Sequence, residues 1–477
     1  MKNIYLLLIC IFLGTMSQAQ IQLSLKDVIS LAKTNSISSK QIENRYQNSY
    51  WRHFSYKRQF LPSLVFNGIL PEFQHSISNV IQNDGAETFV NRNIILNKAN
   101  LSINQLVPLT GGVISIGTGL DNIQLSGNTQ STTYLSRPIE FGYSQNIFGF
   151  NRYKWDKKIE PLYFNEAELL KTEEIEELSI ESVNRYFDLL RDQLSMKNAE
   201  NNFLNNDTIY KIGKGRYGHG RISENELLQL ELSLLNAEMS YEKQKLNFEL
   251  SRQKLATFLG YSSKENIELV LDSLIPEFYV NYSQALSFAN QYHSQIIRQE
   301  KKVLEAEMNV AKVKINNRFN FNLIASFGLS QTADNITNAY LKPQNQEFVS
   351  LGVRVPIVQW GLGRGRTKQA QANSELIKST IEQEKIDFNQ DIYEKVKIFT
   401  LNRKQLKVSN RAKEVAAKRF EVAKQRYLIG KTIVTDLQIA QQEKDNALIK
   451  YINAYRDFWK SYYDIRKTTH YDFEAKT

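Results

Sequence analysis

Residues that could carry enzymatic or metal chemistry are few and far apart in this 477-residue chain. The histidines form no zinc motif such as HExxH, and no nucleophile elbow or complete phosphate-binding loop occurs. We therefore expect no catalytic residue, no metal site and no cofactor, and we interpret the chain as a non-enzyme. The histidines are His53, His75, His219, His293 and His470.

One glycine-rich segment superficially resembles a phosphate-binding loop. Gly361, Gly363 and Gly365 alternate with Leu362 and Arg364, but the remaining spacing of such a loop is missing. No strand–helix–strand unit surrounds the segment either. We interpret it as the connection between a strand and a helix.

The start of the chain has the features of a secretory signal peptide, which we assign to residues 1–19. Lys2 supplies a positive charge, Tyr5–Leu13 form a short apolar run, and cleavage is expected after Ala19. The apolar run is too short to span a bilayer. Because the only cysteine, Cys10, lies in this segment, the exported chain would contain no disulfide and no thiolate metal site.

Charge and hydropathy narrow the function further. The chain has 60 Lys and Arg against 50 Asp and Glu, a net charge of +10, and these charges are mixed along the sequence. Since they form no basic block, we do not expect nucleic-acid binding. No later segment approaches 18 consecutive apolar residues, so we expect no membrane-spanning helix in the mature chain. Strands of a membrane barrel would alternate and are compatible with this sequence.

Alternating patterns predict strands in both halves of the chain. In Phe319–Leu329 every odd-numbered residue is apolar, and Phe348–Val355 is the expected partner strand. In the first half, Ile139, Phe141 and Tyr143 alternate with polar or small residues. A soluble sandwich and a membrane barrel give the same pattern, so the strands alone do not distinguish them.

Helical patterns precede and follow these strands. Residues 24–59 and 281–317 each begin with an apolar helix face, with Ser24 and Ser283 as the expected N-caps. Much longer helices are predicted at 151–212 and 362–428, and returning helices at 223–258 and about 433–467. The 67 residues from 362 to 428 would reach roughly 100 Å. A helix of that length must pair laterally with other long helices.

The two turns that join the long and returning helices align at an offset of 210 residues. Each turn contains a glycine that is expected to take the left-handed conformation that ends a helix. Ser223 and Glu226 predict a capping box at the start of the first returning helix. The aligned pairs are Arg216 with Arg426, Tyr217 with Tyr427, and Gly220 with Gly430.

This order of parts predicts an internal structural duplication. The chain would consist of the signal peptide, a first repeat at 20–270 and a second repeat at 271–477. Each repeat contains a helix, strands and a long helical hairpin. The strands are expected at about 62–149 and 318–358.

Over essentially the whole mature chain, this order resembles the TolC-type outer-membrane efflux channel family. Leu61–Leu64 resembles the family's entry into its first barrel strand. Ser144–Gly149 and Val355–Arg366 resemble the exits from strands into long helices. The two Arg-Tyr-x-x-Gly turns resemble the family's periplasmic hairpin tips.

The resemblance implies an α+β membrane protein in the outer membrane of a Gram-negative bacterium. A homotrimer would share one β-barrel, continued by a long periplasmic α-helical barrel. Each protomer would contribute four strands, or six if the additional hairpin of Ala99–Val107 and Val113–Leu120 belongs to the barrel. The trimer would then have twelve or eighteen strands. The alternative for this hairpin is an enlarged surface loop.

The implied function is the passive channel of a tripartite efflux or export system. The implied partners are outer-membrane lipid, a periplasmic adaptor and an inner-membrane pump of the RND or ABC type. We expect the two hairpin tips to dock the adaptor. The expected docking residues are Arg216, Tyr217, Gly220, Arg221, Ser223, Arg426, Tyr427, Gly430, Lys431 and Thr432.

The candidate tip aperture contains Arg419, Phe420 and Glu421. Family members often hold the closed tip with acidic residues about ten positions before the second tip glycine, and here that position is Phe420. The acidic ring is therefore not carried over, and we expect weak cation selectivity or anion preference.

Two alternative functions remain open at this point. A type I protein-secretion duct would use the same body, and the sequence does not distinguish it. A soluble periplasmic coiled-coil scaffold belongs to a different class and predicts extraction without detergent. The transported substrate is not readable from the sequence.

Overall fold

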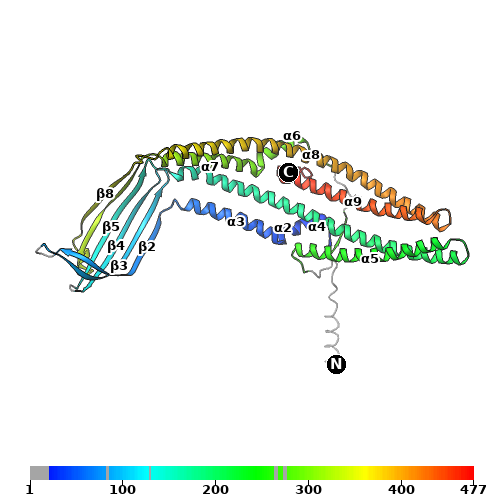
Figure 1. The fold of residues 1–477 in the computed structure, drawn as a ribbon, viewed down its shortest axis with the longest axis horizontal. Coiled ribbons are helices and arrows are strands. Elements are labelled where there is room, and N and C mark those ends of the chain that lie inside the picture. The colour runs from blue at the N-terminus through cyan, green and yellow to red at the C-terminus, as the bar shows by residue number, and fades with distance from the viewer. Residues whose placement is uncertain (1–20, 82–84, 128–129, 263–266, 272–276, 477) are drawn as a thin grey trace, which may run out of the picture. The chain divides into compact units, whose positions relative to one another are not determined.

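The computed structural model describes residues 21–81, 85–127, 130–262, 267–271 and 277–476. The predicted signal peptide at 1–19 and its Cys10 lie outside these residues. The chain divides into two compact units, each built from segments of both predicted repeats (Figure 1). We call them the helical unit (Met1–Gln47, Ala167–Ile296 and Glu384–Thr477) and the sheet unit (Asn48–Glu166 and Ile297–Gln383).

The sheet unit contains a six-stranded antiparallel sheet with the strand order β2-β3-β4-β5-β7-β8. The predicted pairing of 319–329 with 348–355 is confirmed by β7 and β8. The additional hairpin forms β3 and β4, which lie between β2 and β5, so it is part of the sheet and not a surface loop. The strands are β2 (Ser63–Ile81), β3 (Glu87–Val107), β4 (Gly112–Gly127), β5 (Ser131–Ile147), β7 (Asn320–Ala333) and β8 (Gln344–Arg354).

The predicted helix at 24–59 is two helices, α2 (Leu25–Asn35) and α3 (Ile37–Arg58). Ser24 caps α2 as predicted, in a capping box with Asp27. The break occurs at Ser36, whose backbone is extended and whose Oγ accepts a hydrogen bond from the Ser39 amide at 3.0 Å. A serine oxygen that accepts from a nearby backbone amide takes the place of the helical hydrogen bond of that amide. The helix is therefore interrupted here, and the prediction of one helix was wrong.

The predicted helix at 281–317 is also two helices, α6 (Tyr282–Tyr292) and α7 (Ser294–Asn316). Its cap is Asn281, whose side chain accepts from the Gln284 amide, so the prediction of Ser283 was wrong. The break lies at His293, which has an extended backbone. Its Nδ1 accepts from the Gln295 amide at 3.1 Å and thereby starts the second helix.

The long hairpins are α4 (Arg152–Gly218) with α5 (Glu224–Phe258), and α8 (Leu362–Leu428) with α9 (Val434–Thr469). The predicted bounds of α8 are confirmed. α4 continues six residues beyond the predicted end at 212. The added stretch contains Gly215 and Gly218, and it follows Gly213, where a Cβ atom would meet the end of the Leu230 side chain of α5. Glycine therefore lowers helix propensity here without ending the helix.

The core of the helical unit lies where the long helices pack together. The short strands β1 (Ile21–Leu23) and β6 (Ile267–Leu269) pair in parallel and contribute Leu23, Ile267 and Leu269 to this core. Within the described residues, no helix has the length and hydropathy to cross a membrane. The largest fully buried side chains include Tyr186, Phe187, Phe399, Tyr455, Phe458 and Tyr462.

Candidate docking site at the two hairpin tips

The first tip turn ends α4 with the predicted glycine. Gly220 has a φ of +65°, a conformation that glycine adopts at little cost. The Gly220 amide donates to the Tyr217 carbonyl at 2.8 Å, and the Arg221 amide donates to the Arg216 carbonyl at 2.9 Å. This pair of bonds is the Schellman motif, which satisfies the last carbonyls of a helix.

The second tip repeats this geometry at the end of α8. Gly430 has a φ of +74°. Its amide donates to the Tyr427 carbonyl at 2.9 Å, and the Lys431 amide donates to the Arg426 carbonyl at 2.8 Å. The sequence alignment of the two turns therefore corresponds to the same backbone structure.

Arg216 connects the two tips within the helical unit. Its guanidinium donates to the Leu428 carbonyl at 2.9 Å and lies 5.4 Å from the centre of the Tyr427 ring. Burial raises the pKa of the Tyr427 hydroxyl, and the positive charge of Arg216 partly opposes this rise. Tyr427 belongs to a buried cluster with Ile209, Leu230, Phe420, Val434, Leu437 and Ala440.

Most of the other predicted docking residues lie at the surface. Tyr217 is 43% exposed, and Thr432 is half-buried and donates to the Asp436 carboxylate at 2.8 Å. The predicted capping box is confirmed, because Ser223 Oγ accepts from the Glu226 amide and Glu226 accepts from the Ser223 amide. The exposed members of the set are Tyr217, Gly220, Arg221, Ser223, Arg426, Gly430 and Lys431.

The residues of the candidate aperture have three different environments. Arg419 forms an ion pair with Glu443 of α9. Phe420 is buried in the tip cluster, with the Lys444 ammonium 4.4 Å from its ring centre. Glu421 is exposed and accepts from the Gln425 side chain at 2.9 Å. In one chain, therefore, Phe420 contributes to packing between helices.

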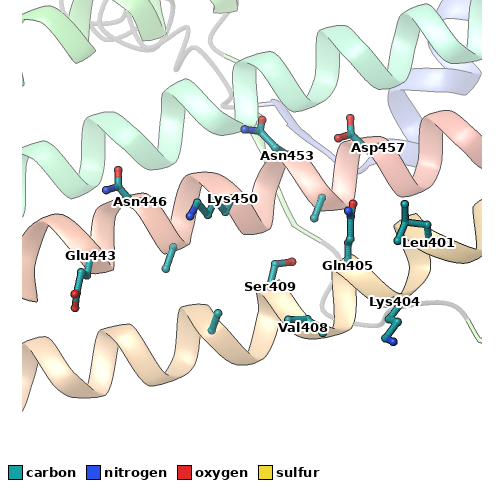
Figure 2. A pocket seen from close by; sticks show the side chains of 13 residues that line it. Leu401, Lys404, Gln405, Val408, Ser409, Glu443, Asn446, Lys450, Asn453 and Asp457 are labelled. Atoms are coloured by element: carbon teal, nitrogen blue, oxygen red, sulfur yellow. The ribbon is translucent and has the colours of Figure 1, made fainter. Parts of the chain in front are cut away.

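A groove of about 800 Å³ lies between α8 and α9 in the helical unit (Figure 2). Leu401 and Val408 of α8 line one side of it, and Ala447 and Ala454 of α9 line the other. Polar and charged side chains stand along its rim, including Lys404 and others labelled in Figure 2. The small alanines leave the apolar side chains of α8 uncovered.

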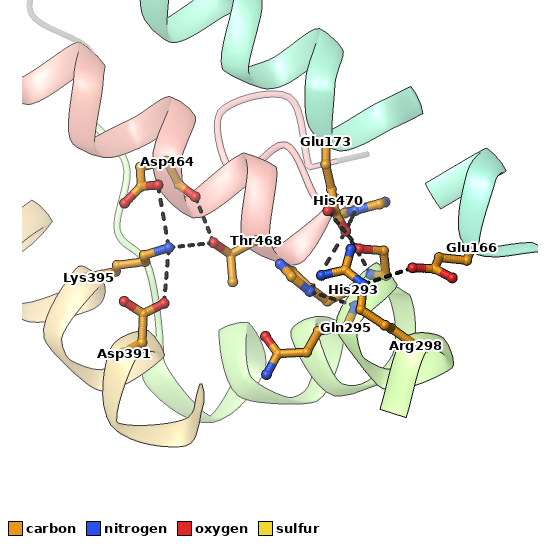
Figure 3. A network of polar contacts seen from close by, with 11 residues as sticks. Glu166, Glu173, His293, Gln295, Arg298, Asp391, Lys395, Asp464, Thr468 and His470 are labelled. Atoms are coloured by element: carbon orange, nitrogen blue, oxygen red, sulfur yellow. Dashed lines mark hydrogen bonds and ion pairs between the residues drawn. The ribbon is translucent and has the colours of Figure 1, made fainter. Parts of the chain in front are cut away.

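A buried carboxylate meets two histidines elsewhere in the helical unit (Figure 3). Glu173 of α4 accepts from the amide and hydroxyl of Ser294, and lies 3.4 Å from His470 Nε2 and 3.7 Å from His293 Nδ1. Burial would raise the Glu173 pKa, but His470, His293 and the Ser294 donors lower it overall.

Sequence reasoning missed this cluster because Glu173 lies more than a hundred residues from each of its partners. The hydrogen bonds of these residues have a structural role. Glu173 joins the α6–α7 break to the end of α9. Among the described residues, no group of three His, Cys, Asp or Glu side chains is placed to hold a metal ion.

Comparison with known proteins agrees with this architecture. Residues 320–468 match the family model of outer membrane efflux proteins. No curated protein gives a significant sequence match to the chain.

Solved outer-membrane channels share the fold. The CmeC channel of Campylobacter jejuni is 16% identical with a TM-score of 0.67, covering 93% of this chain and 85% of CmeC. VceC of Vibrio cholerae is 12% identical with a TM-score of 0.65, covering 93% of this chain and 95% of VceC. The open state of MtrE of Neisseria gonorrhoeae is 13% identical with a TM-score of 0.61, covering 93% of this chain and 88% of MtrE. The family match spans residues 320–468, and the fold of these outer-membrane channels extends over 93% of the chain.

Proposed function

We propose that this chain is an outer-membrane efflux protein and that a homotrimer of it forms a passive duct. Three copies of the sheet would close one barrel of eighteen strands in the outer membrane. The long helices would form a periplasmic tunnel that receives substrate from an adaptor and an inner-membrane pump. The sequence contains no complete phosphate-binding loop for a nucleotide, so the pump would supply the energy for transport.

The observation that carries this proposal is the incomplete, apolar sheet. Its outer strands β2 and β8 each pair with one neighbour among the described residues. An open sheet edge in lipid would leave backbone groups unsatisfied at several kcal/mol each, whereas pairing β8 of one copy with β2 of the next removes both edges. Lipid would cover the apolar side chains of β2 that are more than 60% exposed, namely Leu64, Phe66, Leu70, Phe73, Ile77 and Ile81.

Electron microscopy of the detergent-extracted chain tests the assembly. We expect a threefold particle with eighteen strands in its membrane part and a hollow helical shaft. Insertion of the same particles into planar bilayers should give stable conductance steps. A monomer extracted without detergent would contradict the duct and favour a soluble periplasmic scaffold.

We further propose that the exposed tip residues dock the adaptor. Reversing the charges of Arg221, Arg426 and Lys431 to glutamate should abolish export while the trimer remains intact. Arg216 is left unchanged in this variant, because its guanidinium supports the second tip. The matched control reverses Lys40, Lys57 and Lys197, which are exposed and lie outside the tips.

Normal export by the tip variant, or equal loss in the control, would contradict docking through these charges. A type I protein-secretion duct remains the second candidate, because it would use the same body. Neighbouring genes for an ABC exporter would favour protein secretion, and genes for a proton-driven RND pump would favour small-molecule efflux.

A further inference from the structure

The two segments that lead out of the sheet have the same local structure. β5 leads into α4 through Phe148, and β8 leads into α8 through Trp360. Both residues have a positive φ, +60° for Phe148 and +47° for Trp360, which residues other than glycine rarely adopt. Both side chains are turned towards solvent in the single chain, with Phe148 66% exposed and Trp360 96% exposed. We call residues 148–158 and 355–368 the two sheet exits.

Both sheet exits lie at one end of the sheet, where the long helices begin (Figure 1). The last residues of β5 pair with the first residues of β7, and these pair with the last residues of β8. The Phe148 ring centre lies 5.8 Å from that of Phe319 and 6.1 Å from that of Phe321. Phe321 alternates with Asn320 and Asn322 and so belongs to the apolar face of β7. The first exit therefore continues the face that the proposed duct turns towards lipid.

The charged residues of the sheet exits are almost all positive. The only acidic residue in them is Asp156, which forms an ion pair with Arg152 at 3.1 Å. Among the described residues, the other six cations of the exits have no acidic partner. They are therefore available for charge-assisted hydrogen bonds to an external anion. The cations of the exits are Arg152, Lys154, Lys157, Lys158, Arg364, Arg366 and Lys368.

The opposite end of the sheet has a different charge. Its turns at 82–86, 128–130 and 334–343 contain one lysine and two aspartates. The exits contain seven lysines and arginines and one aspartate. We therefore expect a preference for anionic groups at the end of the sheet where the long helices begin, and no such preference at the opposite end.

The three lysines of the first exit lie on one face of α4. Lys154 is three positions from Lys157 and four positions from Lys158, and all three side chains are exposed. α4 contacts its neighbours through other residues, since Glu160 bonds to α3 and Tyr163 bonds to α7. The lysine face therefore stays accessible in the packed sheet unit.

The cations of both exits lie close to the end of the sheet. Lys154 and Lys158 are two and six residues after the first residue of α4. Arg364 and Lys368 are two and six residues after the first residue of α8. At 1.5 Å per residue, all four are within about 9 Å of the start of their helix, and the polar layer on each side of a bilayer is roughly 5–8 Å thick. Strands in the apolar layer would therefore place these cations in the adjacent polar layer or at its surface.

We propose that the sheet exits bind anionic phospholipid in the periplasmic leaflet of the outer membrane. The cations hold the lipid phosphates, and Trp360 lies among the headgroups, where tryptophan is enriched in membrane proteins. The exposed aromatic side chains and their continuity with the apolar face favour a lipid over a soluble acidic protein. The inference rests on the proposed duct and adds a lipid selectivity, because insertion into a membrane by itself requires only an apolar surface.

Native mass spectrometry of the purified full chain in detergent tests the selectivity. Added cardiolipin should bind about tenfold more tightly than added phosphatidylethanolamine, because cardiolipin has two negative phosphates and phosphatidylethanolamine has no net charge. A variant that neutralises four exit cations should lose most of this difference. Its substitutions are Lys154→Gln, Lys157→Gln, Arg364→Gln and Arg366→Gln.

The matched control neutralises four exposed lysines of the helical unit and should keep the difference between the two lipids. Its substitutions are Lys197→Gln, Lys214→Gln, Lys243→Gln and Lys245→Gln. Unchanged cardiolipin binding in the exit variant, or an equal loss in the control, would overturn the proposal. Release of bound cardiolipin by equimolar inorganic phosphate would indicate a site for any phosphate and would overturn the assignment to lipid.

Fluorescence quenching tests the position of Trp360 at the headgroups. In phosphatidylcholine vesicles, brominated phosphatidylglycerol should quench the protein more than an equal fraction of brominated phosphatidylcholine. The substitution Trp360→Phe should reduce this excess. The control Trp459→Phe removes a tryptophan that is 6% exposed in the core of the helical unit, and it should leave the excess unchanged. Equal effects of the two substitutions would contradict the placement of Trp360.

The wild-type chain separates failure of this inference from failure of the proposed duct. A trimer that conducts but binds cardiolipin and phosphatidylethanolamine equally would reject the lipid selectivity and leave the duct intact. A monomer extracted without detergent would reject both.

Discussion

The two hairpin tips have the same backbone turn but place equivalent side chains in different environments. At the first tip, Tyr217 is 43% exposed and Arg216 is half-buried against the second tip. At the second tip, Tyr427 is 4% exposed and Arg426 is exposed. The sequence repeat preserves the turn because the turn depends on local backbone bonds. It does not preserve side-chain environments, because those depend on which helix packs beside each tip.

We expect the largest effect on stability from removing each tyrosine ring. Tyr427→Ala should destabilise the tip by about 3–5 kcal/mol, because it empties a packed cluster. Tyr217→Ala should cost less than about 0.5 kcal/mol. Hydrogen exchange of amides near the two tips measures both values. Equal effects would contradict the difference in burial.

The next test compares the two arginines. Arg216→Met should cost about 1.5–3 kcal/mol, because it removes charged hydrogen bonds to carbonyls of the second tip and keeps the aliphatic stem. Arg426→Met should stay within about 0.5 kcal/mol. The same exchange experiment applies, and the loss in the Arg216 variant should be seen at residues 420–437. A loss confined to the first tip would contradict the bridging role.

A smaller effect is expected from the helix caps. Ser223→Ala should cost about 1 kcal/mol, because the capping box with Glu226 is lost. The second returning helix begins after Ile433, which is 58% exposed and makes no capping bond. Ile433→Ser should therefore stabilise that tip by about 1 kcal/mol. Thermal unfolding in detergent measures both changes in stability, and we expect them to have opposite signs.

The smallest effect depends on pH. Burial raises the pKa of Tyr427 above its ordinary value of 10.0. The stability from keeping this hydroxyl neutral is fully present below pH 10 and is lost as the pH rises through the higher folded pKa. Tyr427→Phe should abolish this alkaline loss. Unfolding curves at pH 9 to 11 would contradict the assignment if the variant lost stability as steeply as the wild type.

Period-two patterns and the scarcity of glycine and proline predicted much of the fold. The β7–β8 pair and both ends of α8 follow from such local features. The breaks at Ser36 and His293 were missed because a single side-chain bond to a nearby amide decides each of them. The end of α4 was misplaced because the helix continues through Gly213 and Gly215, which have low helix propensity.

For the candidate site, the sequence predicted the turns and the Ser223 cap but not the environment of each side chain. Tyr217 and Tyr427 stand in matching local sequences, so no local pattern separates the exposed ring from the buried one. The Glu173 cluster was missed for a related reason, since a tertiary fold is needed to bring its members together.

The equal lengths of α4 and α8 have a consequence for the evolution of the chain. Each helix has 67 residues, and Arg216 joins the end of one to the end of the other. One inserted residue would advance the following residues by about 1.5 Å and turn them by about 100°, which separates partners at the tips. We therefore expect relatives of this chain to tolerate insertions and deletions only in matched sets of whole heptads in both halves. A longer first helix would then require a longer second helix, so the two helix lengths would change together or stay the same.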